Sequence, residues 1–160
     1  MGNKVACLGL FVTLALIFTY VETLIPFSFG VPGMKLGLTN IALVLLLYWY
    51  GPKEALLVSV LRIFLAGFLF GSFFGILYSL SGALLSLFVM TGARKIQDFG
   101  IIGVSILGGV FHNIGQLLTA MVVVSNYRIG FYLPALLLSG TVTGWLIGTL
   151  ARQISIRISH

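Results

Sequence analysis

Long apolar segments constrain this chain more than any other feature. A helix rises 1.5 Å per residue, so about 20 residues cross the roughly 30 Å hydrocarbon core of a bilayer. Hydrophobic residues make up 59% of the chain and charged residues only 8%, and a soluble domain of this size could not bury so much apolar surface. We therefore predict a polytopic membrane protein in which residues 1–160 form a single integral membrane domain.

Six apolar segments follow one another along the chain. They cover residues 5–21, 41–50, 54–70, 73–91, 101–125 and 131–152. None alternates as a strand does, so we predict an all-α bundle of six helices. The second segment is about half the usual length of a span, which indicates a short or re-entrant helix. No small-x-small cleavage site follows the first segment, and we expect it to be a retained span.

The lysine and arginine residues between these segments predict the orientation of the chain. If both termini share one side of the membrane, six cations lie on that side and two on the other. The first side holds Lys4, Lys53, Arg94, Lys95, Arg152 and Arg157, and the second holds Lys35 and Arg128. This excess predicts a multi-pass protein of the plasma membrane with both termini in the cytoplasm. No run of basic residues is dense enough to indicate nucleic-acid binding.

Residues 22–40, "ETLIPFSFGVPGMKLGLTN", form the longest connection, and residues 22–38 would lie outside the cell. Their prolines and glycines exclude one regular helix. Because glycine permits sharp turns and close backbone approach, we expect the part that carries Lys35 and Asn40 to act as a lid over a pocket. The alternative is an ordinary connector, although it would be long for a compact bundle.

Small residues recur four positions apart, a spacing that lets transmembrane helices approach closely. One stripe in the sixth segment contains Gly140, Gly144 and Gly148, and the first segment contains the pair Gly9 and Thr13. We interpret these residues mainly as sites of internal helix packing. The alternative is a surface that docks a partner protein.

Arg62 interrupts the third segment, in "SVLRIFLAG". An arginine at the centre of a transmembrane helix costs about 2.5–3.5 kcal/mol on insertion scales, so a lipid-facing position would need compensation. Ala55, Ser59, Arg62 and Ala66 follow 3–4 spacing and should form one face that points into the bundle. Two interpretations stay open: Arg62 anchors an anionic group of a ligand, or it pairs with Glu22 or with backbone carbonyls.

The stretch "GGVFHNIGQLL", residues 108–118, places three hydrogen-bonding side chains in an apolar helix. His112, Asn113 and Gln116 are three or four positions apart, so they share one side of that helix. They would bind the polar part of a ligand or hydrogen-bond neighbouring helices, which contributes only about 0.6 kcal/mol on average. A single histidine with no second ligand four positions away does not indicate a metal site, and we expect no cofactor. We expect space around the three side chains to be left by Gly108, Gly109 and Gly115.

The segments "PGMKLGLTN", "EALLVSVLRIFLAGFLFGSF", "GALLSLFVM" and "GGVFHNIGQLL" occur in this order and cover nearly the whole chain. In them the chain resembles the Gx transporter family, whose members are also labelled heptaprenyl diphosphate synthase component I. That family is similar to the substrate-binding S components of energy-coupling-factor transporters. The resemblance implies six membrane helices, cytoplasmic termini and a ligand pocket near the external face, capped by the loop after the first helix. S components often dock their membrane partner through two alanines on the first helix, where this chain has Gly9 and Thr13 at the same spacing.

The favoured function is a substrate-binding, S-component-like subunit of an uptake transporter for a small, partly apolar ligand, anionic or neutral. The chain has no P-loop, so a separate transmembrane coupling subunit and ATPases would supply the energy. The expected ligand contacts are Lys35, Asn40, Arg62, His112, Asn113 and Gln116.

Two alternatives stay open beside this function. The chain would be a non-catalytic membrane accessory protein that binds a prenyl diphosphate or a quinone precursor, or a structural subunit without a ligand. Prenyl diphosphate synthases hold magnesium with aspartate-rich motifs because the diphosphate leaving group needs metal ions. The chain has one aspartate, Asp98, so we expect no enzyme activity from it alone.

Overall fold

The structure is a computed structural model that describes residues 2–24, 37–96 and 98–158. Within these ranges the chain forms six α-helices and one 3-10 helix, and no strand. The elements are α1 (Gly2–Leu24), α2 (Thr39–Trp49), α3 (Pro52–Phe70), α4 (Phe73–Ala93), α5 (Ile101–Val124), the 3-10 helix η1 (Tyr127–Tyr132) and α6 (Leu133–Ile158). The predicted all-α, six-helix architecture is confirmed.

Four helical segments are long and apolar enough to cross a membrane: Asn3–Leu24, Phe73–Ala93, Ile101–Val124 and Tyr127–Ile158. The chain is therefore a helical membrane protein, as its composition indicates. Helix α3 has 19 residues but carries Lys53, Glu54 and Arg62, so at least one of its faces needs protein neighbours instead of lipid. The side of the membrane on which the termini lie stays a prediction.

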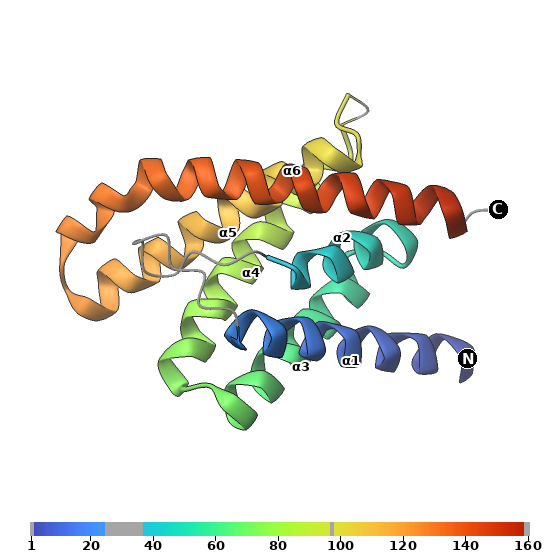
Figure 1. Cartoon of the computed structure of the whole chain (residues 1–160), viewed down its shortest axis with the longest axis horizontal. Helices are drawn as coiled ribbons and strands as arrows, with labels where there is room; N and C mark the ends of the chain where they lie inside the picture. The colour runs from blue at the N-terminus through green and yellow to red at the C-terminus, as the bar shows by residue number, and fades with distance from the viewer. Residues whose placement is uncertain (1, 25–36, 97, 159–160) are drawn as a thin grey trace.

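Helix α2 has only 11 residues and lies inside the bundle, between α1 and α6 in Figure 1. It contacts α1, α3, α5 and α6, and seven of its residues are buried. Its length of about 16 Å covers roughly half of the hydrocarbon core. Because neighbouring helices surround it, α2 does not have to span the core to satisfy its backbone. The predicted short second helix is confirmed.

The half of the bundle that carries the chain ends is packed solid. Helix α1 begins and α6 ends at the same end of the molecule (Figure 1). All six α-helices contribute to one hydrophobic core there, whose fully buried members include Leu46, Leu47, Val58, Met90 and Val104. This core holds the helices together, so the opposite half of the bundle does not need the same density of packing.

Helices α5 and α6 pack backbone against backbone. A Cβ at Gly144 would lie 2.6 Å from the Ile106 Cα, and one at Gly109 would lie 2.5 Å from the Gly140 carbonyl oxygen. Neither distance is possible for a real side chain, so these glycines are what allows the two helices to touch. The internal packing predicted for the stripe of Gly140, Gly144 and Gly148 is confirmed.

Two helix ends differ from the sequence-based expectation. Helix α6 continues to Ile158, past the predicted end at residue 152, because helical hydrogen bonding does not stop where the apolar run gives way to polar residues. Helix α5 ends at Val124, one residue before the predicted end, and Ser125 caps it with a φ of 51°, in the left-handed region. The connection after it is the 3-10 helix η1, which begins where the Asn126 Oδ1 accepts the Arg128 backbone N–H at 3.0 Å.

Candidate functional site

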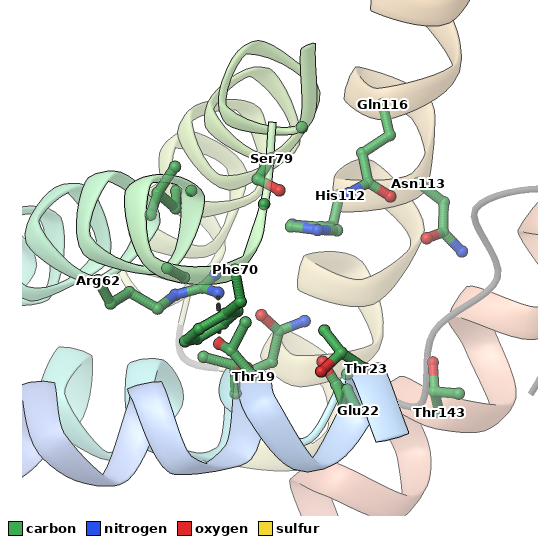
Figure 2. A pocket seen from close by; sticks show the side chains of 18 of the residues that line it. Thr19, Glu22, Thr23, Arg62, Phe70, Ser79, His112, Asn113, Gln116 and Thr143 are labelled. Atoms are coloured by element: carbon green, nitrogen blue, oxygen red, sulfur yellow. Dashed lines mark hydrogen bonds between the residues drawn. The ribbon is translucent and has the colours of Figure 1, made fainter. Parts of the chain in front are cut away.

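A cavity of about 130 Å³ lies in the half of the bundle away from the chain ends. Figure 2 shows side chains that line it. Its wall includes the C-terminal ends of α1 and α3, the N-terminal parts of α2 and α4, and the middle of α5. A water molecule needs roughly 10–15 Å³ of such space. The cavity therefore has room for several waters or for a small organic group.

Five of the six predicted ligand-contact residues line this cavity. They come from three helices that are distant in sequence, α2, α3 and α5. The sixth, Lys35, and most of the predicted lid lie outside the described residues. The five residues are Asn40, Arg62, His112, Asn113 and Gln116.

Arg62 is buried on the face of α3 that the spacing predicted. Its neighbours on that face, Ala55, Ser59 and Ala66, are buried as well, which confirms that this face points into the bundle. The guanidinium Nη1 donates to the Thr19 hydroxyl at 3.3 Å. Its Nε is buried and has no hydrogen-bond partner among the described residues. A buried donor without a partner costs about 1–3 kcal/mol, so a hydrogen-bond acceptor placed at the Arg62 Nε would stabilise the protein.

Glu22 lies in the same cavity and ties α1 to α2. Its carboxylate accepts the backbone N–H of Leu38 at 2.6 Å, and Leu38 is the residue that precedes α2. The positive end of the α2 helix dipole also stabilises a carboxylate at this position. Glu22 attracts Arg62 electrostatically, while the described hydrogen bond of Arg62 goes to Thr19. The cavity thus contains both a cation and an anion.

The three polar side chains of α5 differ in what they contact. Asn113 donates from Nδ2 to the Leu136 carbonyl of α6 at 2.8 Å, so it serves at least partly as an interhelical tie. Gln116 is only 3% exposed, and its amide forms no hydrogen bond with any described residue. Figure 2 shows His112 and Arg62 extending toward each other from opposite sides of the cavity. Gln116 and His112 are therefore better placed than Asn113 to meet a ligand.

The glycines around these side chains do not leave the open space that the sequence suggested. A Cβ at Gly108 would lie 2.5 Å from the Met90 sulfur, and one at Gly115 would lie 2.8 Å from the Ser81 carbonyl oxygen. Gly109 touches α6 in the same way. The expectation was wrong for Gly108 and Gly115, because these glycines let α4 approach α5, which fills the space that a missing side chain would leave. Gly109 packs against α6 and also lines the cavity.

Several hydroxyl groups in the cavity wall were not predicted. Thr19 and Thr23 stand on the last turns of α1, and Ser79 and Thr143 come from α4 and α6. A signal for the first two exists, since polar residues at 19, 22 and 23 share one face at the end of an apolar helix. Serine and threonine elsewhere in a membrane helix give no such signal, because they commonly bond their own backbone.

Gly9 and Thr13, the predicted docking pair, lie on an exposed face of α1. A Cβ at Gly9 would meet nothing within 4 Å, and the Thr13 hydroxyl donates to the Gly9 carbonyl at 3.0 Å. Internal packing is therefore the wrong interpretation for this pair within the described chain. Partner docking stays a proposal.

No group of three metal-ligating side chains gathers among residues 2–24, 37–96 and 98–158. The ion pair that these residues form, between Lys4 and Glu54 at 2.6 Å, lies at the opposite end of the bundle from the cavity. In the cavity wall, Arg62, Glu22, His112 and Gln116 can offer hydrogen bonds and charge to a ligand.

Comparison with protein families gives one match. The family model for heptaprenyl diphosphate synthase component I covers residues 11–154. Comparisons with curated proteins and with solved structures find no significant match. Because the model covers most of the chain, including every residue that lines the cavity, the chain belongs to the heptaprenyl diphosphate synthase component I family.

Proposed function

We propose that this member of the heptaprenyl diphosphate synthase component I family is the ligand-binding membrane subunit of an uptake transporter, similar in role to an S component. Its ligand is small, partly apolar and anionic. One observation carries the proposal: the Nε of the buried Arg62 guanidinium, at the cavity, has no hydrogen-bond partner within residues 2–24, 37–96 and 98–158. Glu22 attracts the guanidinium but does not bond its Nε. A buried charged donor without a hydrogen bond is costly, and an anionic ligand that accepts from Nε would remove that cost.

The remaining wall supports the same ligand chemistry. A guanidinium binds a carboxylate or phosphate through two parallel hydrogen bonds, and the amides of Asn40 and Gln116 can complete its shell. Ile63, Ala66 and Phe70 supply an apolar side to the cavity. A ligand with one anionic end and a short apolar body would match both parts of the wall.

Ligand retention by the purified protein tests the role of Arg62. Small molecules that remain bound after gentle purification are identified by mass spectrometry for wild type, Arg62→Met and Arg128→Met. Arg128 is an exposed cation outside the cavity, so its replacement removes the same charge without touching the site. We expect Arg62→Met to weaken binding about 10- to 150-fold, the effect of one charged hydrogen bond, and Arg128→Met to bind as wild type does.

The same variants separate a ligand anchor from a structural tie. Methionine fills a similar volume without a buried charge, so Arg62→Met should unfold at the same temperature as wild type or higher. If Arg62 mainly held α3 to α1 through Thr19, the variant would unfold at a clearly lower temperature. Equal ligand retention in wild type and Arg62→Met would exclude Arg62 from the site.

Uptake by this chain also requires a partner that hydrolyses ATP. We place the contact for a transmembrane coupling subunit on the exposed face of α1 around Gly9 and Thr13, where no described side chain covers Gly9. Gly9→Trp should prevent co-isolation of that subunit from native membranes without changing ligand retention. Leu138→Trp, at a 71% exposed position of α6, is the matched control. A coupling subunit that is retained by Gly9→Trp would move the contact elsewhere.

A second candidate rests on the family description itself. The chain would be a non-catalytic accessory protein that binds a prenyl diphosphate, with Arg62 meeting the phosphates. A binding measurement on the same variants, with a prenyl diphosphate as the probe, distinguishes the two candidates. Saturable binding of that probe by wild type and its loss in Arg62→Met would favour the second candidate.

A further inference from the structure

A second hollow of the molecule lies on its surface, between α3 and α4. It is an open groove of about 770 Å³ near the end that carries the chain ends. Its sides are apolar, with Leu84 44% and Phe88 80% exposed, and Leu87 is buried at its base. It shares no lining residue with the cavity around Arg62, so it is a separate site.

Two lysines mark one end of this groove. Lys53 stands in the first turn of α3 and Lys95 follows the last turn of α4. Neither ammonium group forms an ion pair or a hydrogen bond with a described residue. Glu54, the acidic neighbour of Lys53, is bonded to Lys4 at 2.6 Å instead. Glu54 attracts Lys53 electrostatically as well, but its direct ion pair is with Lys4. The groove therefore ends in two ammonium groups that form no direct ion pair within the described chain.

The length of the groove fits one leaflet of a bilayer. From Leu84 to Gly92, both in the groove wall, α4 rises about 12 Å. One leaflet of hydrocarbon is about 15 Å thick. With α4 as a membrane span, the apolar part of the groove lies at the depth of acyl chains. Lys95 follows the end of α4 and Lys53 stands in the first turn of α3, which brings both ammonium groups to the depth of lipid phosphates.

We propose that this groove binds one anionic phospholipid. An acyl chain lies along Leu84 and Phe88, and the phosphate lies between Lys53 and Lys95. A helix of another protein would need acidic residues placed opposite the two lysines. An anionic phospholipid carries its negative phosphate at this depth already. The groove therefore favours a lipid over a protein occupant.

Lipid retention measured by native mass spectrometry tests this site. The protein is reconstituted in vesicles of equimolar phosphatidylglycerol and phosphatidylcholine, released into mild detergent, and the bound lipids are counted. Wild type should retain phosphatidylglycerol in preference to phosphatidylcholine. The double variant K53Q/K95Q should lose about 30-fold of that preference, since each lysine near anionic lipid contributes about five-fold.

Two further variants make the outcome decisive. R128Q/R157Q removes the same two charges from exposed positions outside the groove and should keep the wild-type preference. Leu84→Trp fills the groove but keeps both lysines, and it should retain less phosphatidylglycerol while unfolding at the wild-type temperature. A wild-type preference in K53Q/K95Q, an equal loss in R128Q/R157Q, or full retention by Leu84→Trp would each overturn the proposal.

Discussion

Replacement of Gly144 by alanine tests the contact on which the fold most depends. The added Cβ would lie 2.6 Å from the Ile106 Cα and 2.8 Å from the Ser105 carbonyl oxygen. Both atoms belong to the backbone of α5 and cannot rotate away, so α6 has to move outward by about 1 Å to reach ordinary contact distances. Overpacking costs about 1–3 kcal/mol, and a clash with backbone that no rotamer relieves lies in the upper part of that range, at about 2–3 kcal/mol. Alanine returns about 1 kcal/mol through its better helix propensity.

The expected net loss for Gly144→Ala is about 1–2 kcal/mol, or a midpoint lower by about 2–8 °C for a chain of this length. Thermal unfolding in detergent, followed by circular dichroism at the helix band, measures it. Gly9→Ala is the matched control, because its Cβ meets nothing within 4 Å and it should be neutral or stabilising. If Gly144→Ala unfolds at the wild-type temperature, or if Gly9→Ala loses as much, the close packing of α5 on α6 is refuted.

Two more outcomes follow from described hydrogen bonds. Arg94 donates to the carbonyls of Leu47 and Tyr48 and lies over the Tyr48 ring. Arg94→Met should therefore free the end of α2 and lower the free energy of unfolding by about 1–2 kcal/mol. The thermal midpoint measures this loss, with Arg94→Lys for comparison, and an unchanged midpoint would contradict the capping role. Asn113→Leu should cost about 0.6 kcal/mol, because it removes one interhelical bond, whereas Gln116→Leu should cost nothing in stability and should reduce ligand retention. An opposite ranking of these two variants would show that Gln116, not Asn113, ties the helices.

The helices could be predicted from the sequence because lipid demands a long apolar run for each full span. All six were found, and the short α2 was recognised from its length. Hydropathy did not predict where α6 ends, or that other helices surround α2. These depend on helical hydrogen bonding beyond the bilayer and on packing among distant segments, which no single run of residues records.

The candidate site was predictable only in part, for a similar reason. Buried charge in an apolar helix is costly, so Arg62 and the polar residues of α5 stood out, and the structure brings them to one cavity. The glycines beside them were misjudged, because sequence does not show whether a neighbouring backbone fills the space. Ser79 and Thr143 gave no signal at all, since hydroxyls are common in membrane helices that bind nothing.

Thiol labelling of the cavity wall is the most direct test of the account. Cys7 is the chain's single cysteine, so Cys7→Ser gives a background without thiols, into which Ser79→Cys or Ser86→Cys is introduced. Ser79 lines the cavity, whereas Ser86 is 2% exposed in the solid half of the same helix. An anionic, membrane-impermeant methanethiosulfonate reagent should label Ser79→Cys from the side opposite the termini and leave Ser86→Cys unmodified. Equal labelling of both positions, or of neither, would contradict a cavity that is open to water at the end of the bundle away from the chain ends.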